Sequence, residues 1–197
     1  MEFMKQIIFV TTTPERVEVI TNFLHSMREY SGKYSLFIQS GYEYNQFEFA
    51  RDHQFDEILT LNDSIEIKDY SLFDLIFETY KGKSVSFTGH PYFLMDMGKF
   101  KREPYLQAAY EGSETYIGRG THEYLFGTKY CECAKEEPVV LFPDLLEPER
   151  KVNVTNHWVT YETKFGRKNM ILENQYIKKY KGHWTGGMMR SADRNGL

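Results

Sequence analysis

The sequence predicts an α/β protein with a single Rossmann-like domain, in which helices flank a mostly parallel sheet. The main observation is an apolar strand pattern, a helical period and a second strand pattern, all within residues 6–38. The alternation then continues to about residue 88. With 197 residues, the chain can bury one sizeable core but is short for two independent domains. We therefore expect one domain over residues 1–185 and a mobile tail over residues 186–197.

Composition and charge narrow the class of protein. Hydrophobic residues make up 41% and charged residues 26%, as in soluble globular proteins. The net charge of −4 gives no overall field that attracts nucleic acid or an anionic membrane. No segment approaches the roughly 20 apolar residues of a membrane span. The N-terminus lacks the layout of a signal peptide, so we expect a cytoplasmic protein.

The two cysteines are expected to be reduced thiols. Only one residue separates Cys131 from Cys133, and a disulfide across that spacing would be strained. Two thiols alone also do not make a zinc site.

Strand and helix signals justify each element of the first half. The strands are apolar, β-branched runs, expected at residues 6–11, 34–38, 55–61 and 83–88. Thr13 and Pro14 form a good start for the first helix, which ends at Ser31-Gly32. The next helix begins at Asp69 or Ser71 and ends at Gly82. Residues 41–54 show no clear period.

The second half is less regular. We expect residues 92–110 to be partly helical and residues 143–160 to form a loop. Short strands are expected at residues 116–117 and 138–142, and a helix at residues 121–130 after a Gly118-Arg119-Gly120 loop. Residues 165–181 predict a final helix with a basic face.

Polar residues follow each of the first three predicted strands. In an open α/β sheet, ligands bind beyond the carboxyl ends of the strands. If the three strands are parallel neighbours, these polar clusters converge on one rim. In chain order, the clusters are Thr11, Thr12, Thr13 and Arg16; Gln39, Ser40 and Gly41; and Asn62, Asp63 and Ser64. From spacing alone, Asp63 is equally well explained as a turn residue at the end of a strand.

The order of these motifs resembles that of nucleotide-sugar glycosyltransferases of the A-type fold. "FVTTTPERVEVITNFLHSM" is similar to the first strand, polar turn, Arg and first helix of that family. "ILTLNDSIEIKDYSLFDLIF" resembles its later strand, acidic triplet and helix. The resemblance covers about residues 5–130, with gaps in its middle. It implies transfer of a sugar from a nucleotide-diphosphate donor, with a UDP-sugar favoured, to a hydroxyl of a glycan, small molecule or modified nucleic acid.

The resemblance also implies a donor site and a metal. The family triplet is usually Asp-x-Asp and holds a divalent cation that neutralises the leaving diphosphate. By this resemblance Asp63 is the metal ligand for Mn²⁺ or Mg²⁺. The sequence departs from the family by having a single carboxylate there, so we expect weak affinity for a free cation. The donor-binding candidates are Thr11, Thr12, Thr13, Arg16, Gln39, Asn62, Asp63, Ser64, Lys99 and Arg167.

The alternative to a metal is neutralisation of the phosphate by basic residues. Lys99, Lys101 and Arg102 are the candidates, within "MGKFKRE". Arg167 follows a glycine at the start of the predicted final helix, and such a start can bind phosphate.

A candidate general base lies in "GRGTHEYLFGTKYC", which looks like a later signature of the same family. There an acid at a helix start takes the proton from the acceptor hydroxyl. Glu123, or else His122, fills that role here. An acid in a first helical turn also favours the helix dipole without any catalytic purpose. If Glu123 is the base, a single displacement with inversion follows.

Two other classes of function stay open. The first is a binding module that kept the fold and lost catalysis, as the depleted triplet suggests. The second is a nucleic-acid-binding or nucleic-acid-modifying protein that uses the basic final helix. The sequence lacks the motifs of kinases, serine hydrolases and dinucleotide enzymes. It indicates no oligomeric state.

Overall fold

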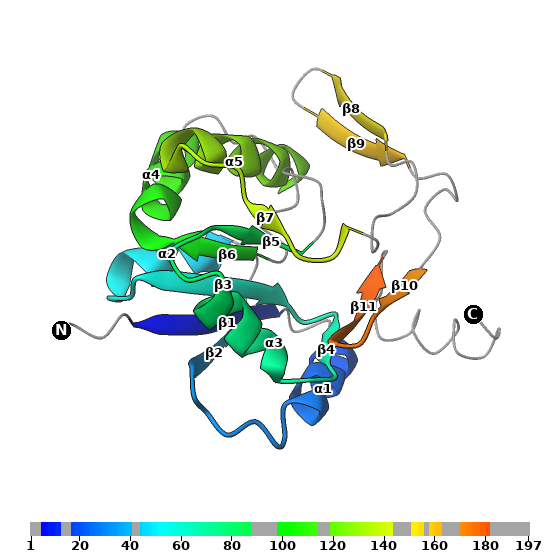
Figure 1. The fold of residues 1–197 in the computed structure, drawn as a ribbon. Helices are drawn as coiled ribbons and strands as arrows, with labels where there is room; N and C mark the ends of the chain where they lie inside the picture. The colour runs from blue at the N-terminus through cyan, green and yellow to red at the C-terminus, as the bar shows by residue number, and fades with distance from the viewer. Residues whose placement is uncertain are drawn as a thin grey trace.

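A six-stranded sheet in the order β2-β1-β3-β6-β5-β7 forms the centre of the molecule (Figure 1). The structure, a computed structural model, describes residues 5–12, 17–40, 44–87, 98–113, 119–143, 151–155, 158–162 and 170–181. β1 is parallel to β2 and β3, β5 is parallel to β7, and β6 is antiparallel to both of its neighbours. The strands are β1 (Gln6–Thr12), β2 (Ser35–Ser40), β3 (Glu57–Asn62), β5 (Val85–Ser86), β6 (Gly98–Lys101) and β7 (Val139–Val140).

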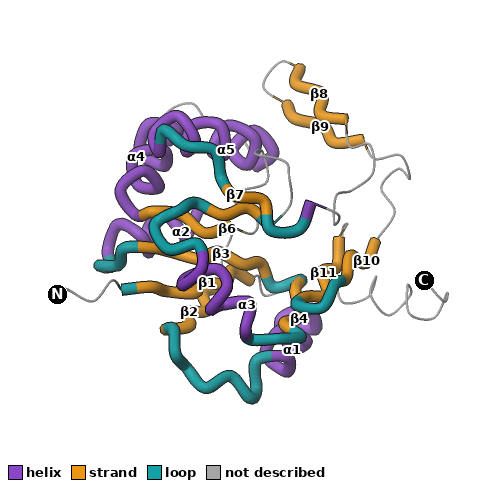
Figure 2. The backbone as a smooth tube through the Cα atoms, in the orientation of Figure 1, coloured by secondary structure: helices purple, strands orange, loops and turns teal. Residues whose placement is uncertain are grey.

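Helices cover both faces of this sheet, which confirms the α/β class and is compatible with a Rossmann-like fold (Figure 2). One face packs against α1 and against α3 with its π-helical continuation η2. The other packs against α2, α4 and α5. The helices are α1 (Val17–Ser26), α2 (Tyr44–Asp52), α3 (Ser71–Asp74), η2 (Leu75–Thr79), α4 (Arg102–Ser113) and α5 (Arg119–Ala134).

β1 shows why the first apolar run forms a central strand. Its side chains alternate between the two cores: Ile8 and Val10 enter one, and Ile7 and Phe9 enter the other. A strand covered on both faces needs a continuous apolar run instead of an apolar–polar alternation.

The first two helical segments end earlier than expected: α1 ends at Ser26 and η2 at Thr79, whereas the ends were predicted at Ser31-Gly32 and Gly82. Gly32 follows α1 and its turn, and Gly82 follows η2, with φ angles of +79° and +72°. This left-handed region favours glycine, because it has no Cβ.

Two small sheets were not predicted. Residues 143–160 were expected to be a loop, yet they contain β8 (Lys151–Thr155), which pairs with β9 (Trp158–Glu162). Residues 165–181 were expected to be a helix, yet their described part forms β10 (Met170–Glu173) and β11 (Ile177–Lys181). β11 also pairs with β4 (Ile65–Ile67), which directly follows the polar triplet.

Asn174 explains why the last segment turns back instead of forming a helix. Its side-chain oxygen accepts hydrogen bonds from the backbone N–H groups of Tyr176 and Ile177, at 2.8 and 2.9 Å. Such a side-chain turn competes with helix formation. Pairing with β4, over a hundred residues earlier, then completes the strand.

Two further elements differ from the expectation. Residues 41–54 contain α2, which buries Phe49 and Ala50 against the sheet although its polar residues obscure the period. Residues 92–110 include β6 as well as the expected helix, α4.

α5 confirms the helix expected at residues 121–130, but it begins at Arg119, where a loop was expected. It carries Cys131 and Cys133, which form no disulfide. Burial raises the pKa of the Cys131 thiol to about 11. The strand expected at residues 116–117 and the tail at residues 186–197 lie outside the described residues.

Candidate functional site

The carboxyl ends of β1, β2 and β3 bring the predicted polar residues together. Thr11 at the end of β1 lies opposite Gln39 of β2 on one side and Asn62 of β3 on the other. Thr12 lies opposite Ser40. The convergence of these residues on one rim of the sheet is therefore confirmed.

Asp63 is the central residue of this rim. It lies in the turn between β3 and β4, and only 1% of it is exposed. The hydroxyl of Thr12 donates a hydrogen bond to Asp63 Oδ2 at 2.9 Å. A buried carboxylate is rare unless its charge is compensated, so Asp63 is more than an exposed turn residue.

Lys179 of β11 joins the same triplet. It is 2% exposed and lies opposite Ile65, just after the triplet. Its ammonium donates hydrogen bonds to Ser64 Oγ at 2.6 Å and to Asn62 Oδ1. Sequence reasoning missed this role, because it assigned Lys179 to a solvated helical face. The run Ile177, Lys178, Lys179 and Tyr180 shows no apolar–polar alternation, so no local signal pointed to a strand that buries Lys179.

Hydrogen bonds fix the segment that follows the triplet between α1 and β11. Ile67 N–H donates to Ser26 Oγ of α1 at 3.0 Å. On the other side, Tyr180 N–H donates to the Ser64 carbonyl at 2.9 Å. Lys68 forms an ion pair with Glu173 of β10 at 2.7 Å. These contacts fix the position of Lys179 next to the triplet.

The described residues do not fit the Mn²⁺ or Mg²⁺ ion that the resemblance implies at Asp63. A hard cation needs several oxygen ligands. Asp63 is the only carboxylate of the triplet, and the side-chain oxygens of Asn62 and Ser64 both accept hydrogen bonds from the Lys179 ammonium. Within the described part of the chain, no group of three or more His, Cys, Asp or Glu residues is arranged to hold a metal.

Lys99 lies away from the rim, so its predicted contact with phosphate is not supported. Its ammonium forms an ion pair with Glu57 at 2.7 Å and also donates to the Tyr80 carbonyl at 2.7 Å. Glu57 is the first residue of β3, at the end opposite to the triplet. Burial lowers the pKa of Lys99, although the hydrogen bond and charge of Glu57 oppose the shift. The charge of Lys99 is therefore used inside the fold.

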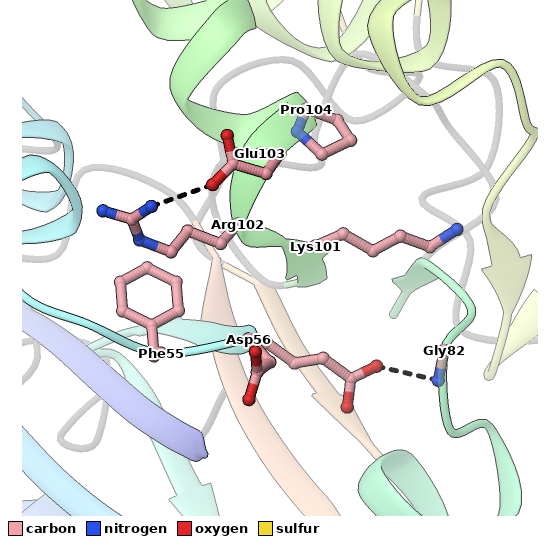
Figure 3. A pocket seen from close by; sticks show the side chains of 8 residues that line it. Phe55, Asp56, Gly82, Lys101, Arg102, Glu103 and Pro104 are labelled. Carbon is pink, nitrogen blue, oxygen red and sulfur yellow. Dashed lines mark hydrogen bonds and ion pairs between the residues drawn. The ribbon is translucent and has the colours of Figure 1, made fainter. Parts of the chain in front are cut away.

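Lys101 and Arg102 line a pocket of about 340 Å³ at this opposite end (Figure 3). Lys101 pairs with Glu136 at 2.7 Å, and Arg102 pairs with Glu103 at 2.9 Å. Figure 3 shows Arg102 directed toward Glu103, above the ring of Phe55. Because these cations already have carboxylate partners and lie at the amino end of β3, their predicted role in neutralising the phosphate is not supported either.

The remaining candidates are placed only in part. His122 and Glu123 lie in the opening turns of α5, as expected for a helix start. Thr13, Arg16 and Arg167 lie outside the described residues.

In the described part of the chain, no helix has both the length and the apolar character to cross a membrane.

Comparisons with known proteins assign no family to this chain. No protein-family model, no curated protein and no solved structure matches it.

Proposed function

We propose that the protein is a glycosyltransferase that moves a sugar from a nucleotide-diphosphate donor to an acceptor hydroxyl, with a UDP-sugar as the favoured donor. The observation that carries the proposal is the buried carboxylate of Asp63, bonded to Thr12 at the carboxyl end of the parallel strands. Ligands of open α/β sheets bind at this end. The resemblance of the triplet and its flanking elements to A-type glycosyltransferases adds the class of ligand.

The polar row across the three strands suits a nucleotide. Gln39, Thr11 and Asn62 lie side by side in the register of the sheet. Their amide and hydroxyl groups both donate and accept hydrogen bonds, as the hydroxyls of a ribose and the edge of a base require. Thr13, which directly follows β1 in the sequence, and the nearby Arg16 complete the proposed nucleotide contacts.

Glu123 is the proposed general base. It takes the proton of the acceptor hydroxyl, and the acceptor oxygen forms a bond to the anomeric carbon of the sugar. The bond from that carbon to the diphosphate breaks, and the nucleoside diphosphate leaves with the electron pair. One displacement of this kind inverts the anomeric centre. The acceptor is a hydroxyl of a glycan, a small molecule or a modified nucleic acid.

A second candidate is a nucleotide-binding module without turnover. It is favoured by one observation: the triplet has a single carboxylate, and Lys179 bonds to both of its neutral side chains. The nucleic-acid alternative was based on a basic final helix, whereas the described part of that segment forms β10 and β11; it stays an untested alternative.

Thermal melts with uridine, UDP, UDP-sugars and other nucleoside diphosphates test the proposal. A ligand at a hundred times its dissociation constant stabilises by about 2.7 kcal/mol, which raises the melting temperature by roughly 5–10 °C for a chain of this size. The expected result is stabilisation by one nucleotide family, together with release of the nucleoside diphosphate from the nucleotide sugar when an acceptor is added. Stabilisation without any release supports the binding module. If no nucleotide stabilises the protein, the proposed function is wrong.

A further inference from the structure

Lys179 is buried at the end of the sheet where ligands bind, and this placement needs an explanation. Lysine is almost never fully buried unless it is paired, because removing its charge from water is costly. Here the ammonium contacts Asn62 and Ser64, on either side of Asp63. A cation is thus built into the centre of the proposed donor site.

The ammonium lies where the neutral oxygens of the triplet would otherwise face a metal ion. Asn62 Oδ1 and Ser64 Oγ are the hard, uncharged ligands that the triplet offers, and both accept hydrogen bonds from Lys179 Nζ. A divalent ion at the same oxygens would have to displace the ammonium and would be repelled by it. The triplet therefore suits a fixed ammonium better than an exchangeable metal.

We propose that Lys179 takes the place of a divalent cation, so that the protein binds the diphosphate of its nucleotide without a metal. This inference rests on the proposed function. Lys179 acts as a positioning residue: it orients Asn62 and Ser64 and supplies positive charge at the carboxyl end of β3. A preorganised charge stabilises the negative charge that develops on a leaving diphosphate.

The hairpin around Lys179 holds this charge in place. β11 pairs with both β10 and β4, and Tyr180 N–H donates to the Ser64 carbonyl at 2.9 Å. A fixed charge loses little freedom when the ligand binds, whereas a surface lysine loses much of its rotamer entropy.

Lys178 provides a matched control on the same strand. Its ammonium lies 5.1 Å from the centre of the Tyr180 ring, and its register partner on β4 is Glu66. Adjacent residues of a strand point to opposite faces. Lys178→Met thus removes the same charge from the same strand without touching the triplet.

The first experiment uses the wild-type chain and calorimetric titration with UDP and uridine, in EDTA and in Mn²⁺. We expect UDP to bind more tightly than uridine in EDTA, and Mn²⁺ to change its dissociation constant by less than about twofold. A requirement for Mn²⁺ would overturn the inference and leave the proposed function standing. If neither uridine nor UDP binds under any condition, the proposed function itself is wrong.

The second experiment compares Lys179→Met with Lys178→Met. We expect Lys179→Met to weaken UDP binding about 10- to 100-fold, because the variant loses both the positive charge near the diphosphate and the ammonium that orients Asn62 and Ser64. Uridine lacks the diphosphate, so its binding should fall by much less than that of UDP, a split that a merely structural role would not produce. Lys178→Met should bind both as the wild type does. Equal UDP affinity in the two variants would contradict the inference.

Lys179→Arg keeps the test decisive if Lys179→Met does not fold. Arginine retains the positive charge and the ability to donate to two oxygens. We expect it to retain metal-independent discrimination of UDP from uridine. Loss of that discrimination in a folded Lys179→Arg protein, or its absence from the wild type in EDTA, would refute the role of Lys179.

Discussion

The Lys99–Glu57 ion pair gives the sharpest test of which lysines belong to the fold. Both side chains are buried, at 0% and 2% exposure, with 2.7 Å between Lys99 Nζ and Glu57 Oε1. Lys99→Met would leave the Glu57 charge buried without this partner. Breaking such a pair typically costs about 3–5 kcal/mol. For a chain of this size, that corresponds to a melting temperature lowered by roughly 6–20 °C.

Thermal and urea unfolding of three variants measure this effect. Lys99→Met combined with Glu57→Gln should recover much of the loss, because no uncompensated charge remains in the core. Lys101→Met is the control: its ion pair with Glu136 is about a third exposed, at 31% and 27%, so the variant should lose at most about 1 kcal/mol. A Lys99→Met protein with wild-type stability but weak nucleotide binding would refute the reasoning and return Lys99 to the donor site.

Three further predictions concern the site and the pH dependence of stability. Asp63→Asn should stay folded, because its amide oxygen can still accept the Thr12 hydrogen bond. It should abolish donor-dependent activity, because it removes the only carboxylate of the triplet. Full activity would exclude Asp63 from the mechanism. Glu123→Gln should lower turnover by about 10²–10⁴-fold at unchanged donor affinity, as steady-state kinetics and nucleotide titration can show; a fall in donor affinity instead would make Glu123 a binding residue. Burial alone would raise the pKa of Glu136, but hydrogen bonds, chiefly from Lys101, outweigh it and lower the pKa from 4.5. The stability that Glu136 contributes is therefore present above about pH 4.5 and lost as the pH falls through the lower, folded-state value. Acid unfolding should show Glu136→Gln less stable than the wild type at neutral pH and the difference vanishing in acid; a constant difference would contradict this assignment.

The rim of polar residues could be predicted because its signals are local. The continuous apolar run of β1 and the abrupt end of β3 at Asn62 are both visible in the sequence. The rule that strand–helix–strand units form parallel neighbours then places Thr11 beside Gln39 and Asn62, as the register shows. No long-range information was needed for this part of the fold.

The sheet formed by β10, β11 and β4 could not be predicted, because the contacts that hold it together join residues distant in sequence. Lys179 and Ser64 are 115 residues apart. Within residues 165–181 the apolar positions Ile171, Tyr176 and Ile177 fit a helical face as well as two strands. Only the pairing of β11 with β4 selects the hairpin, and it carries Lys179 to the triplet.

Lys99 and Lys179, which are both buried, differ in the end of β3 that their charges reach. Lys99 reaches the first residue of β3 and meets the carboxylate of Glu57, at the amino end of the sheet. Lys179 reaches the carboxyl end of β3 and donates hydrogen bonds to the neutral oxygens of Asn62 and Ser64, where ligands of α/β sheets bind. The composition of the chain does not distinguish the two lysines, and the local sequence favoured Lys99 as the phosphate ligand. The geometry argues against that choice, because Lys99 is paired with Glu57 at the amino end of β3, and we propose Lys179, at the carboxyl end, in its place.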